Sequence, residues 1–87
     1  MENRVYVSVD VCFDIYGQML PKNIKWEDGS VYSIDKVTDI RQAYAAKAGS
    51  SGDRYTIMIN GKEKYLFFER SPALSGNLLG SWFVERR

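Results

Sequence analysis

The sequence predicts an all-β fold, a small antiparallel barrel or a strongly curled sheet of about six strands. From Val5 to Ile15 every odd position is apolar, and a period of two places these side chains on one face of a single strand. A strand with one apolar and one polar face is typical of antiparallel sheets. Two turn signals, Asp28-Gly29 and Asn60-Gly61, then indicate hairpins further along the chain.

The first hairpin follows from the apolar pattern. We expect a strand from about Arg4 to Tyr16 and a second from about Lys22 to Glu27. Cross-strand partners share a face, so Ile24 needs an apolar partner. A two-residue turn would place Ile24 opposite Ser33, whereas a three-residue loop over 27–29 places it opposite Tyr32. We therefore predict the three-residue loop.

The stretch after Ile34 allows two structures. Val37 and Ile40 continue the apolar pattern in steps of three, which fits either a bulge in a continuing strand or the start of a helix. A helix over about 40–48 would be capped by Thr38-Asp39 and stopped by a glycine. In the alternative, the strand continues to about Arg41 and 43–51 is a loop. The sequence leaves one short helix near 40–48 open.

The second half of the chain predicts a hairpin and a closing strand. Asn60-Gly61 favours a type I′ turn between strands over 55–59 and 64–70, with Ile57 opposite Lys64. We expect a loop over 71–80 and a last strand over 81–85 that packs against the first. The strand over 64–70 is apolar on both faces, and a flat sheet would leave one of them in water. An SH3-like barrel is our first choice, and an OB-like barrel or a curled sheet packed on a helix are the alternatives.

Composition bounds the function. Eighty-seven residues make a single domain, 1–87, and twelve basic against eleven acidic residues give a net charge of +1, which argues against affinity that depends on covering phosphates. The chain has no histidine and one cysteine, Cys12, which we expect to be half-buried. The commonest general base and metal ligand are therefore missing. We expect no enzyme activity, no cofactor and no metal.

Localisation is expected to be cytoplasmic. Met1–Arg4 leads directly into the first strand, which does not fit a signal peptide. No apolar run approaches the roughly 20 residues of a membrane span.

Two features indicate partner binding. Basic and aromatic residues interleave, and the candidate partner-binding residues are Arg41, Arg54, Lys62, Tyr65 and Phe67. Small barrels bind nucleic acid by stacking bases on aromatics within a basic groove; alternatively, the aromatics are core and the basic residues protect edges. The second feature is an excess of apolar side chains on the outer face, which marks a protein partner or a homodimer unless 43–48 or 71–80 covers it. Its members are Tyr6, Tyr16, Met58, Tyr65 and Phe67.

The chain also shows a resemblance over most of its length. It is carried by Trp26-Glu27-Asp28-Gly29, Ile34-Asp35-Lys36-Val37, Gly61-Lys62-Glu63, Tyr65-Leu66-Phe67-Phe68-Glu69 and Trp82-Phe83-Val84-Glu85. With these segments the chain resembles a group of short, uncharacterised single-domain proteins of Gram-positive bacteria. The resemblance implies a stand-alone bacterial domain and brings no ligand or catalytic residue. Some similar proteins are encoded beside lesion-bypass DNA polymerases, which implies a DNA-repair or mobile-element context.

Together these observations predict a small, non-catalytic binding module for protein–protein interaction, with another protein or a second copy as partner. The alternative is a nucleic-acid-binding barrel that uses Arg41, Arg54, Lys62 and Tyr65. Salt separates the two, because binding to phosphates weakens steeply with salt.

Overall fold

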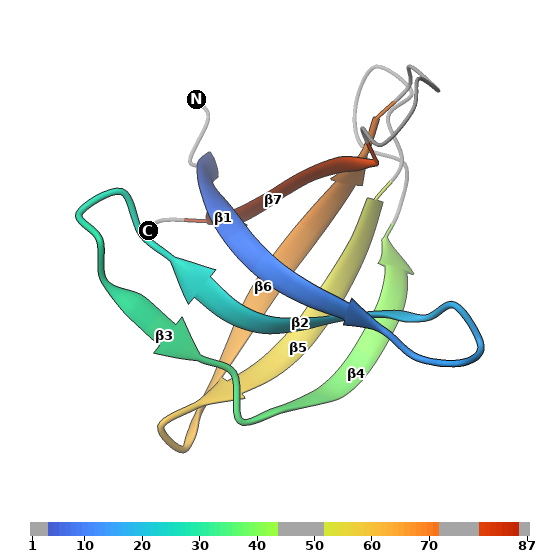
Figure 1. The fold of residues 1–87 in the computed structure, drawn as a ribbon, viewed down its shortest axis with the longest axis horizontal. Coiled ribbons are helices and arrows are strands. Elements are labelled where there is room, and N and C mark those ends of the chain that lie inside the picture. Colours follow the sequence, from blue (N-terminus) through green and yellow to red (C-terminus); the bar gives the residue numbers. More distant parts are fainter. Residues whose placement is uncertain (1–3, 44–51, 72–78, 86–87) are drawn as a thin grey trace.

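The computed structural model describes residues 4–43, 52–71 and 79–85, and these residues contain strands and turns but no helix. All neighbouring strands are antiparallel, in one sheet of order β3-β2-β1-β7-β6-β5-β4 (Figure 1). The seven strands are β1 (Arg4–Phe13), β2 (Met19–Lys25), β3 (Val31–Ser33), β4 (Lys36–Ala43), β5 (Gly52–Ile59), β6 (Lys62–Arg70) and β7 (Gly80–Glu85).

The connection between β3 and β4 makes the sheet curl. These strands are the two edges of the sheet, yet only Ile34 and Asp35 join them in the chain. The Asp35 N–H donates to the Met58 carbonyl at 2.8 Å, and the Asp35 carboxylate accepts from the Asn60 N–H at 3.0 Å. The sheet therefore bends into a half-barrel (Figure 1), which confirms the predicted all-β, barrel-like fold, with seven strands instead of six.

The core lies on the concave face of the sheet. Its buried members come from four strands: Ile24, Tyr55, Ile57, Ile59, Leu66, Phe68 and Trp82. The alternating valines of β1 pack against this cluster, and β7 pairs with β1 through Val5–Val84 and Val7–Trp82. The predicted packing of the last strand against the first is confirmed.

Both predicted hairpin registers are confirmed. Ile24 lies opposite Tyr32, and the loop over 27–29 closes through a 2.8 Å bond from the Trp26 N–H to the Ser30 carbonyl. In the second hairpin, Asn60 and Gly61 have φ values of 52° and 78°, as a type I′ turn requires. Ile57 accordingly lies opposite Lys64.

The first turn differs from the prediction. The first strand was expected to reach Tyr16, but β1 ends at Phe13 because the Asp14 carboxylate accepts from the Tyr16 and Gln18 N–H groups, both at 2.9 Å, and builds a turn. Ile15 leaves the apolar face and is 91% exposed. Cys12, near the end of β1, is exposed instead of half-buried.

The second strand begins earlier than predicted. It starts at Met19 and includes Pro21, which is buried and lies opposite Val11. Proline has no N–H for a strand ladder and is tolerated at bulges. The register of β1 and β2 shifts between Asp10 and Val11, and this bulge accommodates Pro21 inside the sheet.

The bulged strand, not the helix, follows Ile34. The register of β4 and β5 shifts between Val37 and Asp39, after which Ile40 lies opposite Tyr55 on the core side. A helix beginning at residue 40 is therefore wrong, because Ile40 is needed in the sheet to cover the core. The remainder of the predicted helix, 44–48, lies outside the described residues, as does 72–78 of the predicted loop.

Candidate functional site

A row of large side chains crosses the convex face of the sheet. Tyr6, Phe83, Phe67, Arg54 and Arg41 lie in direct register on β1, β7, β6, β5 and β4. Residues in register share a face, and each of the five has at least one chain neighbour that belongs to the core or packs against it, so the five point away from the core. We call these five residues the outer row.

The aromatic half of the outer row is tightly packed. The Phe67 and Phe83 rings stack with centroids 5.1 Å apart and planes 7° apart, and Tyr6 meets Phe83 edge-on at 5.5 Å. The Arg4 guanidinium lies 4.6 Å from the Phe83 ring centroid. Phe83 is therefore only 6% exposed although it lies on the convex face.

Glu69 joins the parts of this aromatic cluster. It accepts a 3.0 Å hydrogen bond from the Tyr6 hydroxyl and pairs with Arg4 at 3.4 Å. These contacts hold Arg4 over the ring and Tyr6 at its edge. These contacts thus restrict the side chains of the cluster to one arrangement.

The arginine half of the outer row is less well satisfied. The Arg54 guanidinium lies 4.7 Å from the Tyr65 ring centroid, but its Nε is buried and has no hydrogen-bond acceptor among the described residues. Its cross-strand neighbour is another cation, Arg41, and the carboxylate nearby, Asp39, is already paired with Arg41 at 2.8 Å. Like charges directly opposite each other destabilise a sheet. Among the described residues, Arg54 therefore contacts the Tyr65 ring, but its Nε has no hydrogen-bond acceptor.

Four of the five predicted site residues come together. Arg41, Arg54 and Phe67 belong to the outer row, and Tyr65 stacks beside Arg54. Lys62 does not join them, because it pairs with the core residue Ile59 and so lies on the concave side.

The sequence placed Tyr6 on the outer face but did not predict that Phe83 and Arg4 form one cluster with it. The signal was present in the alternation of the last strand. If Trp82 and Val84 face the core, Phe83 must face outward, next to the outward residues of whichever strands pair with it. Only the strand order, with β7 between β1 and β6, shows that those neighbours are Tyr6 and Phe67.

The charge on the convex face is mixed. The alternation that orients the outer row also turns Glu63, Glu69 and Glu85 outward, and Asp39 lies opposite Thr56 on the same side. These carboxylates lie among the arginines of the face. The described part of the convex face therefore has no continuous positive field of the kind that attracts a polyanion.

Beside the outer row, β6 has a free edge. The pairing of β6 with β7 ends at Phe67–Phe83, whereas β7 continues along β1 to Glu85 and β6 begins at Lys62. The two strands lie together at the upper right of Figure 1 and diverge towards the lower left. In the part of the chain that the structure describes, residues 62–66 thus lack a strand partner on this side.

An open cavity adjoins this free edge. Its volume is about 710 Å³, and apolar side chains from both halves of the sheet line it, including Ile24, Trp26, Tyr32 and Val84. Trp26 and Tyr32 meet edge-on with centroids 6.4 Å apart. Four exposed charged residues also line the cavity, namely Lys62, Glu63, Lys64 and Glu85, so it combines an apolar lining with charges of both signs.

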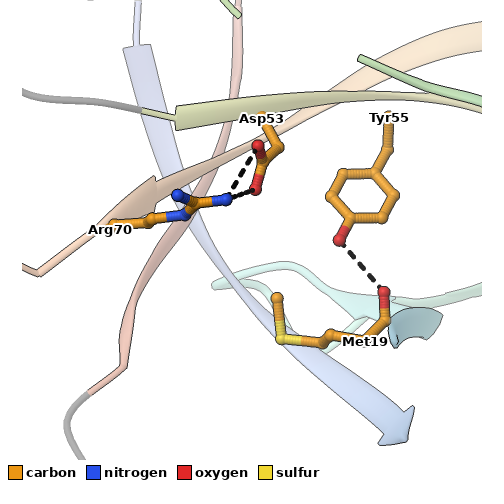
Figure 2. A network of polar contacts seen from close by, with 4 residues as sticks. All are labelled: Met19, Asp53, Tyr55 and Arg70. Carbon is orange, nitrogen blue, oxygen red and sulfur yellow. Dashed lines mark hydrogen bonds and ion pairs between the residues drawn. The ribbon is translucent and has the colours of Figure 1, made fainter. Parts of the chain in front are cut away.

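A separate polar network occupies the concave side (Figure 2). Arg70 donates to both carboxylate oxygens of Asp53, at 3.2 and 3.1 Å, and the Tyr55 hydroxyl donates to the Met19 carbonyl at 3.0 Å. Burial, reinforced by the negative charge of Asp53, raises the pKa of Tyr55 above its ordinary value of 10.0. Each of the four residues drawn has a partner among the others, so we assign this network to holding β2, β5 and β6 together.

Neither a metal centre nor a membrane span is found in the described ranges. Within 4–43, 52–71 and 79–85, no three His, Cys, Asp or Glu residues gather where they could hold a metal ion. The same ranges contain no helix long and apolar enough to cross a membrane. Comparison of the chain with protein-family models, with curated proteins and with solved structures finds no match.

Proposed function

We propose that this chain is a non-catalytic, cytoplasmic protein-interaction module of SH3-like build that binds its partner with the outer row and Tyr65. The observation that carries the proposal is Arg54. A buried donor without an acceptor costs about 1–3 kcal/mol, and the Arg41 cation directly opposite adds repulsion. A partner carboxylate placed beside Arg54 and Arg41 would offset the repulsion between the two cations, whereas the buried Nε itself stays out of its reach. Arg54 thus weakens the isolated domain and strengthens a complex.

The surroundings of Arg54 support a protein partner. Tyrosine and arginine are the residue types that most often dominate protein interfaces, and Tyr6 and Tyr65 are 54% and 45% exposed. The stacked Phe67 and Phe83 rings give these side chains a rigid base. Mixed charge around an aromatic centre is also common at protein interfaces. The DNA-repair or mobile-element context implied by the resemblance gives a first set of partners to examine.

Site-specific photo-crosslinking in cells that naturally contain the chain tests this proposal. The photoreactive amino acid replaces Glu63, which is exposed beside Tyr65, and in a control it replaces Lys25 on β2. We expect a discrete protein adduct from position 63 and none from position 25. Arg54→Met should abolish the adduct, while Lys22→Met, a matched loss of one exposed cation elsewhere, should leave it.

Thermal unfolding of the same variants gives the second half of the test. Because Arg54→Met removes an unsatisfied donor and a like-charge contact, we expect its Tm to equal or exceed that of the parent chain. Loss of the adduct together with an undiminished Tm supports the proposal. An adduct that survives Arg54→Met, or a variant that unfolds well below the parent, would count against it.

Single-stranded nucleic acid is the second candidate partner, because two arginines lie side by side next to an exposed ring, at Arg41, Arg54 and Tyr65. Bases stack on such rings while cations bind the phosphates. Oligonucleotides added to the ¹⁵N-labelled chain at low and moderate salt distinguish the two candidates. Amide shifts around Arg54 that vanish with salt would favour nucleic acid. No shift at any salt concentration would remove it.

A further inference from the structure

The free edge of β6, residues 62–66, has an unmatched pattern of charge. On the paired side, Lys62, Glu63 and Lys64 lie opposite Ile59, Met58 and Ile57 of β5. None of the three forms an ion pair with a described residue. Along the open edge the charge of successive residues is therefore positive, negative and positive, and Tyr65 and Leu66 follow. An incoming strand with the opposite pattern would gain a favourable cross-strand pair at each charged position.

A second copy of this chain does not fit the pattern. Two identical edges that pair antiparallel about a two-fold axis place some residue opposite itself. Centred on Lys64, the pairing sets lysine against lysine, and centred on Glu63 it sets glutamate against glutamate and Lys62 against Lys64. Centred on Tyr65, it needs Phe67 as a partner for Glu63, but Phe67 is already paired with β7. Like charges directly opposite are destabilising, so the edge discriminates against itself.

We propose that the free edge of β6 receives an extended segment of a partner protein, which adds to the sheet as an antiparallel strand. The segment carries acidic residues opposite Lys62 and Lys64, a basic residue opposite Glu63, and an apolar residue opposite Leu66. Its main chain hydrogen-bonds to β6, as in other cases of strand addition. This inference rests on the proposed function and specifies that the partner binds as an extended strand.

Two existing features assist such a strand. Its side chain opposite Leu66 points to the concave side, where the cavity lined by Trp26, Tyr32 and Val84 lies. Its residue opposite Tyr65 points to the convex side, beside the ring that carries Arg54. One extended segment can therefore contact the outer row and the cavity at once.

Two short peptides test the inference. The complementary peptide is acetyl-Leu-Thr-Glu-Lys-Glu-Thr-amide, and the control, acetyl-Leu-Thr-Lys-Glu-Lys-Thr-amide, exchanges its charges. Each is titrated to millimolar concentration into the ¹⁵N-labelled chain. We expect the complementary peptide to shift amides within 62–66 and to slow their hydrogen exchange. It should bind roughly tenfold more tightly than the control, because three cross-strand charge pairs change from attraction to repulsion.

Charge reversal on the chain separates strand recognition from general attraction. The combined variant Lys62→Glu, Glu63→Lys, Lys64→Glu should prefer the control peptide instead. Lys22→Glu shifts the net charge of the chain by the same amount at a position on β2, and it should leave the original preference unchanged.

Two results would overturn the inference: no amide within 62–66 responds to either peptide, or the preference fails to reverse in the combined variant. If the position-63 adduct still depends on Arg54 in that case, only the strand-addition model falls. If that dependence is absent as well, the proposed function falls with it.

Discussion

Tyr55→Phe isolates one hydrogen bond at the centre of the fold. The Tyr55 ring is 4% exposed, and its hydroxyl donates to the Met19 carbonyl at 3.0 Å, which links β5 to β2 (Figure 2). Phenylalanine keeps the ring against Trp82, whose centroid is 5.1 Å away, and removes only the hydroxyl. The loss of one such bond costs about 1 kcal/mol. For a domain of this size that lowers Tm by about 4–8 °C.

The raised pKa of Tyr55 also predicts how the stabilising contribution of its hydroxyl changes with pH. The pKa of Tyr55 is raised in the folded chain, mainly by burial, so the unfolded chain loses this proton first as the pH rises. The stabilising contribution of the hydroxyl is therefore complete below pH 10, near the unfolded pKa of tyrosine, and is lost as the pH rises through the folded value. Urea unfolding of both chains at a series of pH values measures the difference.

The advantage of the parent chain over Tyr55→Phe should shrink above pH 10. Tyr16→Phe is the control: Tyr16 is 87% exposed, so this change should alter stability by less than about 0.5 kcal/mol. Equal stability of the parent and Tyr55→Phe at pH 7 would refute the reasoning about the hydrogen bond. A difference that stays constant from pH 8 to 11 would refute the reasoning about the pKa.

Three further substitutions test the packing, each by urea unfolding. Gly80→Ala should cost roughly 2 kcal/mol or more, because a Cβ there would overlap the Glu69 carbonyl oxygen and lie 2.7 Å from Cζ of Phe68; a normal midpoint would contradict the close approach of β6 and β7. Leu66→Ala should cost about 2–5 kcal/mol, since Leu66 is fully buried. Ile15→Ala should change stability by less than about 0.5 kcal/mol, because Ile15 lies exposed in the first turn, and a large loss would mean that this residue is covered.

Local chemistry made the hairpins predictable. At Asn60-Gly61 both residues adopt positive φ readily, and that conformation fixes a two-residue turn and with it the whole register of β5 and β6. At the first hairpin, the requirement that Ile24 face an apolar residue selected the correct loop length. Both inferences need only neighbours in the chain.

The errors arose at an unrecognised local turn and at a strand whose structure depends on distant contacts. Ile15 continues the apolar alternation, but the Asp14 turn removes it from the sheet. The residues after Ile34 suit a helix by composition, yet Ile40 is required opposite Tyr55. Pairing with β5, which lies later in the chain, overrides the local preference.

The candidate site was predictable in residue type but not in arrangement. Interleaved arginines and aromatics indicated a binding surface, and four of the residues named lie on one face. Lys62 was named on the same grounds but lies on the concave side. Side chains alternate between the two faces of a strand, and Lys62 is three positions from Tyr65. The lack of an acceptor for Arg54 appears only when its neighbours in space are known.

The doubly apolar β6 now has an explanation. Its inward residues, Leu66 and Phe68, complete the core, so folding accounts for them. Its outward residues, Tyr65 and Phe67, add nothing to that core and instead support the outer row. Because the two sets point to opposite sides of one strand, Tyr65→Ala should alter binding with little effect on stability, since Tyr65 is 45% exposed, whereas Leu66→Ala should mainly lower stability. β6, which the sequence predicts to be apolar on both faces, therefore carries both part of the proposed binding surface and the free edge at which we propose strand addition.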